Sequence, residues 1–148
     1  KIPTTFIHRD FHSRNLMLAE TNNPGVLDYQ DAMIGPITYD LVSLLKDCYI
    51  EWDEILIKDM SKSFYTKIKD QHPSSSFEEF MYWLDTNGVQ RHLKAIGIFS
   101  RLKYRDNKSS YMDDIKRTFN YIDNIINKYP EMNEMKMAFD ILDIKGKL

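Results

Sequence analysis

Short β-branched or apolar runs, separated by polar loops, occupy the first part of the chain, and positions with helical spacing occupy the rest. The β-prone runs are Thr4-Thr5-Phe6-Ile7, Leu16-Met17-Leu18 and Val26-Leu27. Between the last two runs, Asn22-Asn23-Pro24-Gly25 combines the fixed φ of proline with a glycine that tolerates positive φ. We therefore predict a β-hairpin whose turn lies between residues 18 and 26.

Apolar residues recur at spacings of three and four from Pro36 onward, which predicts helices. Pro36 suits the first turn of a helix, and Asn87-Gly88 is a pair that ends one. Asp53, Ser76 and Ser110 are each placed to cap the helix that follows. The predicted helices run from residue 36 to about 48, from 53 to near 72–73, from 76 to 87–88, from 89 to about 104, from 110 to 129–130 and, more weakly, from about 135 to 142. The predicted fold class is mainly α with a small β-hairpin.

The composition indicates a globular protein with balanced charge. Of 148 residues, 43% are hydrophobic, which is enough to bury a core. The 20 basic and 22 acidic residues give a net charge of −2 without a long run of one sign, so we expect no nucleic-acid partner and no polybasic membrane contact. No apolar run approaches the roughly 18 residues that span a bilayer. The single cysteine, Cys48, excludes an intrachain disulfide and favours a reducing, cytoplasmic location, where we expect it to be buried and inert.

The clearest chemical signal is the segment from His8 to Asn15, which has the pattern H-R-D-x-x-x-x-N. In phosphoryl-transfer enzymes with this loop, the Asp takes the proton of the acceptor hydroxyl and the Asn helps to hold Mg²⁺. Asp10 suits the first task, and Asn15 with Asp28 suits the second, because hard cations prefer oxygen ligands. The predicted hairpin brings Asn15 and Asp28 to the same end. Each residue alone fits an ordinary turn, so the prediction depends on the whole set.

Five neighbouring residues have supporting or open roles. His12 and Arg14 lie between the base and the metal ligand, and each is a candidate for contact with the phosphoryl group or the acceptor and equally for a structural role. We expect His8 and Arg9 to hold the loop rather than to react. Asp40 lies early in an otherwise apolar helix, and the backbone N–H groups of the loop are suitable donors to its carboxylate if it is buried.

These residues resemble the aminoglycoside phosphotransferase family and other kinase-like small-molecule kinases. Two further segments carry the resemblance: residues 27–32 match the family's metal-binding Asp segment, and residues 35–41 match its Gly-Pro-x-x-x-Asp-Leu segment. Over residues 28–32, 35–50 and 88–102 the chain looks most like anomeric N-acetylmuramate/N-acetylglucosamine kinases.

The resemblance implies an ATP-dependent kinase that uses Mg²⁺ and phosphorylates the anomeric hydroxyl of an amino sugar, N-acetylmuramate or N-acetylglucosamine, in peptidoglycan recycling. It implies Asp10 as the base, Asn15 and Asp28 as the Mg²⁺ ligands, and Asp40 as a support of the catalytic loop. Asp28-Tyr29-Gln30 stands where protein kinases have Asp-Phe-Gly, and no Ala-Pro-Glu segment follows. This difference favours a small acceptor over a protein.

The resemblance also implies that the chain holds only part of the enzyme. The lobe that covers the nucleotide is missing, so residues 1–148 correspond to a C-terminal lobe of the kinase-like fold. Residues 1–34 would hold the catalytic loop and hairpin, and residues 35–148 a helical subdomain. We expect the chain to need its missing N-terminal lobe and to be inactive alone. The alternatives are a kinase for an aminoglycoside or another small alcohol, and a non-catalytic kinase-like module that binds a partner.

Overall fold

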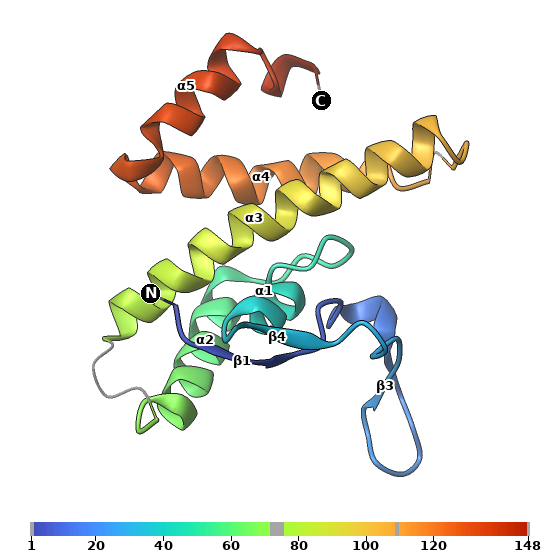
Figure 1. The fold of residues 1–148 in the computed structure, drawn as a ribbon, viewed down its shortest axis with the longest axis vertical. Coiled ribbons are helices and arrows are strands. Elements are labelled where there is room, and N and C mark those ends of the chain that lie inside the picture. The colour runs from blue at the N-terminus through green and yellow to red at the C-terminus, as the bar shows by residue number, and fades with distance from the viewer. Residues whose placement is uncertain (1, 72–75, 109, 148) are drawn as a thin grey trace. The chain divides into compact units, whose positions relative to one another are not determined.

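The computed structural model describes residues 2–71, 76–108 and 110–147. The chain forms two compact units, Lys1–Gly88 and Val89–Leu148, and helix α3 (Phe77–Tyr104) contributes to both. The described residues are mainly helical, as the sequence predicts, and they form two small antiparallel sheets where the sequence predicts one hairpin (Figure 1). None of the described helices is both long and apolar enough to cross a membrane.

The first unit contains two separate two-stranded sheets. Strand β1 (Thr4–Ile7) pairs antiparallel with β4 (Met33–Pro36), and β2 (Leu16–Met17) pairs antiparallel with β3 (Gly25–Val26). The β2–β3 pair is the predicted hairpin, and β1 is the first predicted strand. The fourth strand, β4, is absent from the sequence prediction.

Pro36 ends strand β4, so the prediction that it begins a helix is wrong. It lies opposite Thr4 in the β1–β4 pair, and α1 (Tyr39–Leu45) starts only after the strand has ended. A Cβ at Gly35 would overlap the side chain of Ile7, so any larger residue at this position would force the buried Ile7 side chain to move. The strand pairing therefore overrides the local preference of Pro36 for a helix start.

Helix α2 (Glu54–Ile68) begins at the predicted cap. The Asp53 carboxylate accepts a hydrogen bond from the Ile55 N–H at 2.8 Å, which satisfies a backbone donor of the first turn. The helix ends at Ile68, and the predicted end near residues 72–73 lies outside the described residues.

Helix α3 also begins at its predicted cap, but it does not end where the sequence predicts. The Ser76 hydroxyl accepts a hydrogen bond from the Glu79 N–H at 3.1 Å. Hydrogen bonds from its own backbone N–H and then from the Ser76 side chain lower the pKa of Glu78. The helix continues through Asn87-Gly88, so the predicted break there is wrong. The Asn87 amide donates to the Thr38 hydroxyl at 2.8 Å, a tertiary contact that directs this side chain away from a capping role.

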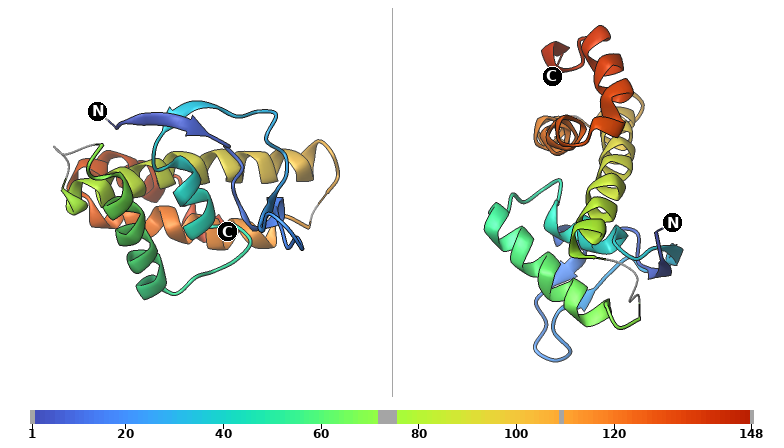
Figure 2. Two further views of the ribbon diagram at one scale, coloured as in Figure 1. Left: turned by 90° about the horizontal axis from the view of Figure 1, so that it is seen from below. Right: turned by 90° about the vertical axis from the view of Figure 1, so that its left-hand side faces the viewer.

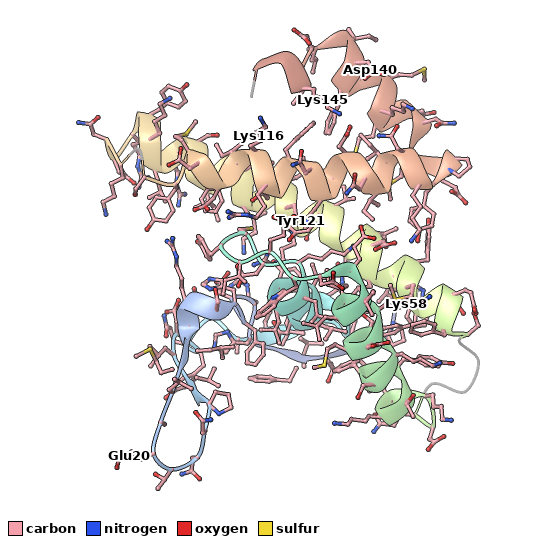
Figure 3. The ribbon with its side chains drawn as sticks, turned by 180° about the vertical axis from the view of Figure 1, so that it is seen from behind. Glu20, Lys58, Lys116, Tyr121, Asp140 and Lys145 are labelled. Atoms are coloured by element: carbon pink, nitrogen blue, oxygen red, sulfur yellow. The ribbon has the colours of Figure 1, made fainter. Side chains whose placement is uncertain are left out.

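The second unit is built from the end of α3 and four C-terminal segments. These are α4 (Asp113–Lys128), η2 (Pro130–Met132), α5 (Asn133–Ile141) and η3 (Lys145–Lys147). Its core joins Val89 of α3 to isoleucines of α4, with apolar side chains of η2 and α5 packed against them. Helix α5 turns back along α4 (Figures 1 and 2). Lys145 donates to Asp123 at 2.8 Å, and this hydrogen bond and the carboxylate charge raise the pKa of Lys145 (Figure 3).

The predicted apolar stripe of α4 is confirmed. Its four members are all buried: Ile115, Phe119, Ile122 and Ile126. The helix ends before Tyr129-Pro130, as predicted. It begins after Met112 without a side-chain cap, so the predicted cap at Ser110 is wrong.

Candidate active site

The loop that follows β1 is held by a carboxylate from α1. Asp40, in the first turn of that helix, accepts hydrogen bonds from the His8 N–H at 2.6 Å and the Arg9 N–H at 3.0 Å. Arg9 has a φ of 79°, a conformation that costs about 1–3 kcal/mol for a residue with a side chain. The Arg9 guanidinium also donates to the Asp31 carbonyl at 3.2 Å. These contacts hold the backbone as the chain enters Asp10.

Asp10 and Asn15 are joined through the main chain of the loop. The Asp10 carbonyl oxygen accepts hydrogen bonds from the His12 N–H at 3.0 Å and from Asn15 Nδ2 at 2.9 Å. Because the Asn15 amide nitrogen points into the loop, its oxygen remains available as a ligand atom. Within the part of the chain that the structure describes, no residue donates a hydrogen bond to the half-buried Asp10 carboxylate. That group can therefore accept one from a bound hydroxyl.

The β2–β3 hairpin brings the segments of Asn15 and Asp28 together. The Leu27 N–H donates to the Asn15 carbonyl at 2.9 Å, which continues the pairing beyond the two strands. The His8 ring donates from Nε2 to the Leu27 carbonyl at 2.8 Å, so this buried histidine ties the loop to the same segment. The His8 side chain thus makes a hydrogen bond that links two parts of the folded chain.

Asp28 combines a left-handed backbone with an exposed carboxylate. Its φ is 64°, a region that Asp and Asn enter more readily than most residues. The Gln30 side chain donates to its Oδ1 at 2.5 Å. An amide oxygen from Asn15 and a carboxylate from Asp28 are the donor types that Mg²⁺ takes alongside water and phosphate oxygens. The donor set fits the metal, and the assignment of these two residues as ligands stays a prediction.

His12 and Arg14 both contact the ring of Tyr49. The Arg14 Cζ lies 3.7 Å from the ring centroid, and the His12 ring meets Tyr49 edge-on with the centroids 5.3 Å apart. Asp47 is fully buried and accepts hydrogen bonds from the Ser13 and Tyr49 N–H groups, each at 2.8 Å. The Asp47 carboxylate therefore joins the loop of residues 8–15 to the segment after α1.

Asp47 and Tyr49 are not among the site residues predicted from the sequence. The signal was present, because Asp47 is an acidic residue in an apolar run and needs buried donors for the same reason as Asp40. The preceding Lys46 forms a buried ion pair with Asp85, with Nζ and Oδ1 2.7 Å apart. Two adjacent charged residues within an apolar segment thus indicate two separate tertiary contacts.

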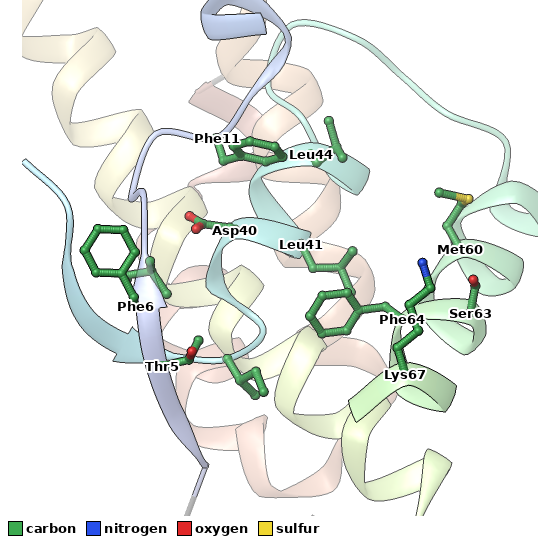
Figure 4. A pocket seen from close by; sticks show the side chains of 12 residues that line it. Thr5, Phe6, Phe11, Asp40, Leu41, Leu44, Met60, Ser63, Phe64 and Lys67 are labelled. Carbon is green, nitrogen blue, oxygen red and sulfur yellow. The ribbon is translucent and has the colours of Figure 1, made fainter. Parts of the chain in front are cut away.

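A cavity of about 350 Å³ lies beside the loop of residues 8–15, between β1, α1 and α2 (Figure 4). Its wall is mostly apolar, with Phe6, Phe11, Leu44 and Phe64 among the lining side chains. Asp40 reaches the cavity, but its carboxylate already accepts hydrogen bonds from the loop. A sugar hydroxyl or a phosphate would find few partners there, so we do not place the acceptor in this cavity.

Acidic and histidine side chains do not form a metal centre by themselves. Among residues 2–71, 76–108 and 110–147, no group of three or more His, Cys, Asp or Glu side chains is placed to hold a metal ion. A site built on Asn15 and Asp28 would therefore take its remaining ligands from water and from the phosphate groups of a nucleotide.

Comparison with known proteins first finds a match to a family model. Residues 1–67, which contain the whole loop and hairpin, match the model of the phosphotransferase enzyme family. This match confirms the resemblance inferred from the motif residues.

The chain is also similar to three enzymes named N-acetylmuramate/N-acetylglucosamine kinase. It is 47% identical over 132 residues to the one from Neisseria meningitidis serogroup B, covering 88% of this chain and 39% of the relative. It is 44% identical over 135 residues to the one from Pseudomonas aeruginosa, covering 90% and 40%. It is 30% identical over 141 residues to the one from Caulobacter vibrioides, covering 93% and 38%. The chain thus spans about two fifths of the length of these relatives.

Proposed function

We propose that this chain is the C-terminal lobe of a cytoplasmic kinase that transfers the γ-phosphoryl group of ATP to the anomeric hydroxyl of N-acetylmuramate or N-acetylglucosamine. The observation that carries the proposal is the Asp10 carboxylate, which no described residue binds, on a loop whose backbone Asp40 and Asn15 hold. The names of the relatives supply the acceptor. Residues 1–34 form the catalytic part of this lobe and residues 35–148 its helical part.

Asp10 is the proposed base. Its carboxylate accepts a hydrogen bond from the anomeric hydroxyl and takes the proton as the sugar oxygen bonds to the γ-phosphorus and the bond from phosphorus to the ADP oxygen breaks. The backbone contacts of Asp40 and Asn15 hold the base in place before the acceptor binds, so less reorganisation is needed during the reaction.

Asn15 and Asp28 are the proposed Mg²⁺ ligands. The Asn15 oxygen and the Asp28 carboxylate hold the ion at the end of the hairpin, and His12 and Arg14 are the candidates for contact with the phosphoryl group or the acceptor. Mg²⁺, when bound, neutralises charge on the phosphate groups.

The proposal is tested with the full-length protein, MgATP and a panel of acceptors. We expect the highest kcat/KM with N-acetylmuramate and N-acetylglucosamine, and a sugar 1-phosphate as the product in phosphorus NMR. The methyl glycoside of N-acetylglucosamine is the matched control, because its anomeric oxygen is blocked and it should give no product. Phosphorylation of this glycoside, or a preference for an aminoglycoside, would contradict the proposal.

The 148-residue chain alone is expected to show no turnover with MgATP and amino sugar. The chain spans about two fifths of its relatives, and the resemblance assigns the nucleotide-covering lobe to the remainder. Phe6 and Ile34, on the paired strands β1 and β4, are also 70% and 64% exposed, as expected of a surface that further chain covers. ADP release is the measurement, with the Asp10→Asn version of the same chain as background. Turnover above that background would disprove the need for the missing lobe.

A further inference from the structure

The catalytic loop has a second anchor, on the other side of Asp10 from Asp40. Asp40 binds the backbone before Asp10, whereas Asp47 binds the Ser13 N–H after it, at 2.8 Å. Asp47 is fully buried, and its other oxygen accepts a hydrogen bond from the Tyr49 N–H at 2.8 Å. A buried carboxylate needs such donors, so Asp47 fixes Ser13 and Tyr49 relative to each other.

The hydrogen bond from the Tyr49 N–H to Asp47 holds the Tyr49 residue whose ring lies against the Arg14 guanidinium. The Tyr49 ring lies 3.7 Å from the Arg14 Cζ and meets the His12 ring at its edge. A cation–π contact favours one position of the guanidinium over the many that a free arginine side chain samples. The buried Lys46–Asp85 ion pair also restrains this segment.

We propose that Asp47 and Tyr49 are positioning residues that hold the Arg14 guanidinium ready for the γ-phosphoryl group, an inference that rests on the proposed kinase function. Arg14 directly precedes Asn15, whose carbonyl binds the Leu27 N–H, so the backbone of Arg14 lies beside the end of the hairpin that carries the proposed metal ligands. The transferring group spreads negative charge over its oxygens. A planar cation held in one orientation can bind two of these oxygens at once.

A double-mutant cycle in the full-length protein tests whether Tyr49 acts through Arg14. We expect Arg14→Ala to lower kcat/KM by about 100-fold and Tyr49→Leu to lower it by about tenfold. Tyr49→Phe keeps the ring and should stay within about twofold of the wild type. In the Arg14→Ala background, Tyr49→Leu should cause no further loss, because the cation that it positions is gone. Additive losses, or a Tyr49→Phe protein as impaired as Tyr49→Leu, would overturn the proposal.

Amide hydrogen exchange, measured by NMR, tests the anchor without any assay of activity. In Asp47→Asn one of the two acceptor oxygens becomes an NH2 group, so exchange should accelerate at Ser13 or at Tyr49, whichever amide loses its acceptor, and stay unchanged at His8 and Arg9. Asp53→Asn, at the exposed cap of α2, is the matched control and should leave all four amides unchanged.

The two measurements separate the inference from the function on which it rests. Unchanged exchange in Asp47→Asn would overturn the anchor and leave the kinase assignment intact. A wild-type protein inactive on every sugar of the panel would overturn the kinase assignment and, with it, the role of Arg14. If Asp47→Asn fails to fold, the Tyr49 variants alone decide.

Discussion

Replacement of Asp10 by asparagine is expected to lower kcat of the full-length protein by about 10²–10⁴-fold. Asparagine has nearly the same size but cannot take the proton of the acceptor hydroxyl. The substitution should leave the loop intact, because His12 and Asn15 bind the carbonyl oxygen of residue 10 and not its side chain. Affinity for MgATP and the free energy of unfolding should therefore stay close to those of the wild type. Steady-state kinetics, nucleotide titration and denaturant unfolding measure the three quantities.

Asp59→Asn is the matched control for Asp10→Asn. It makes the same chemical change on the exposed surface of α2, away from the loop, and should leave kcat unchanged. Retention of more than about a tenth of the wild-type kcat in Asp10→Asn would disprove the role of Asp10 as base. A large loss of stability in the same variant would show that the side chain supports the loop.

The sequence predicts best those features that depend on contacts between residues close together in the chain. The caps at Asp53 and Ser76 are examples, because each carboxylate or hydroxyl binds an N–H two or three residues ahead. Asp40 accepts hydrogen bonds from residues much farther away in the sequence. This contact could still be predicted, because a carboxylate in an apolar helix needs donors, and the backbone N–H groups of the loop supply them.

Long-range pairing accounts for the features that the sequence does not reveal. Strand β4 exists because β1 pairs with it, and four residues that include Gly35-Pro36 carry no strand signal of their own. Asn87 carries a strong helix-ending signal, but its hydrogen bond to Thr38 is a tertiary contact that no local rule predicts. Asp47 and Ser13 are 34 residues apart, so the second anchor becomes visible only in the folded chain.

Replacement of Asp28 by asparagine is expected to raise the Mg²⁺ concentration needed for half-maximal nucleotide binding and to lower kcat by about 100-fold or more. Asparagine keeps an oxygen ligand but removes the negative charge that the cation favours. The backbone also tolerates asparagine well, because the φ of 64° at this position suits Asp and Asn, whereas alanine would add strain. Fluorescent-nucleotide titrations at several Mg²⁺ concentrations measure binding without turnover, and kinetics measure kcat.

The Mg²⁺ dependence distinguishes Asp28 from Asp10. Excess Mg²⁺ should restore part of the activity of Asp28→Asn, because a weakened site can be refilled, but none of the activity of Asp10→Asn, because a missing base cannot be replaced by the metal. Glu20→Gln is the matched control, since it removes one negative charge from the exposed loop of the same hairpin (Figure 3) and should leave the Mg²⁺ dependence unchanged. An Asp28→Asn protein whose Mg²⁺ dependence equals that of Glu20→Gln would show that Asp28 does not hold the metal.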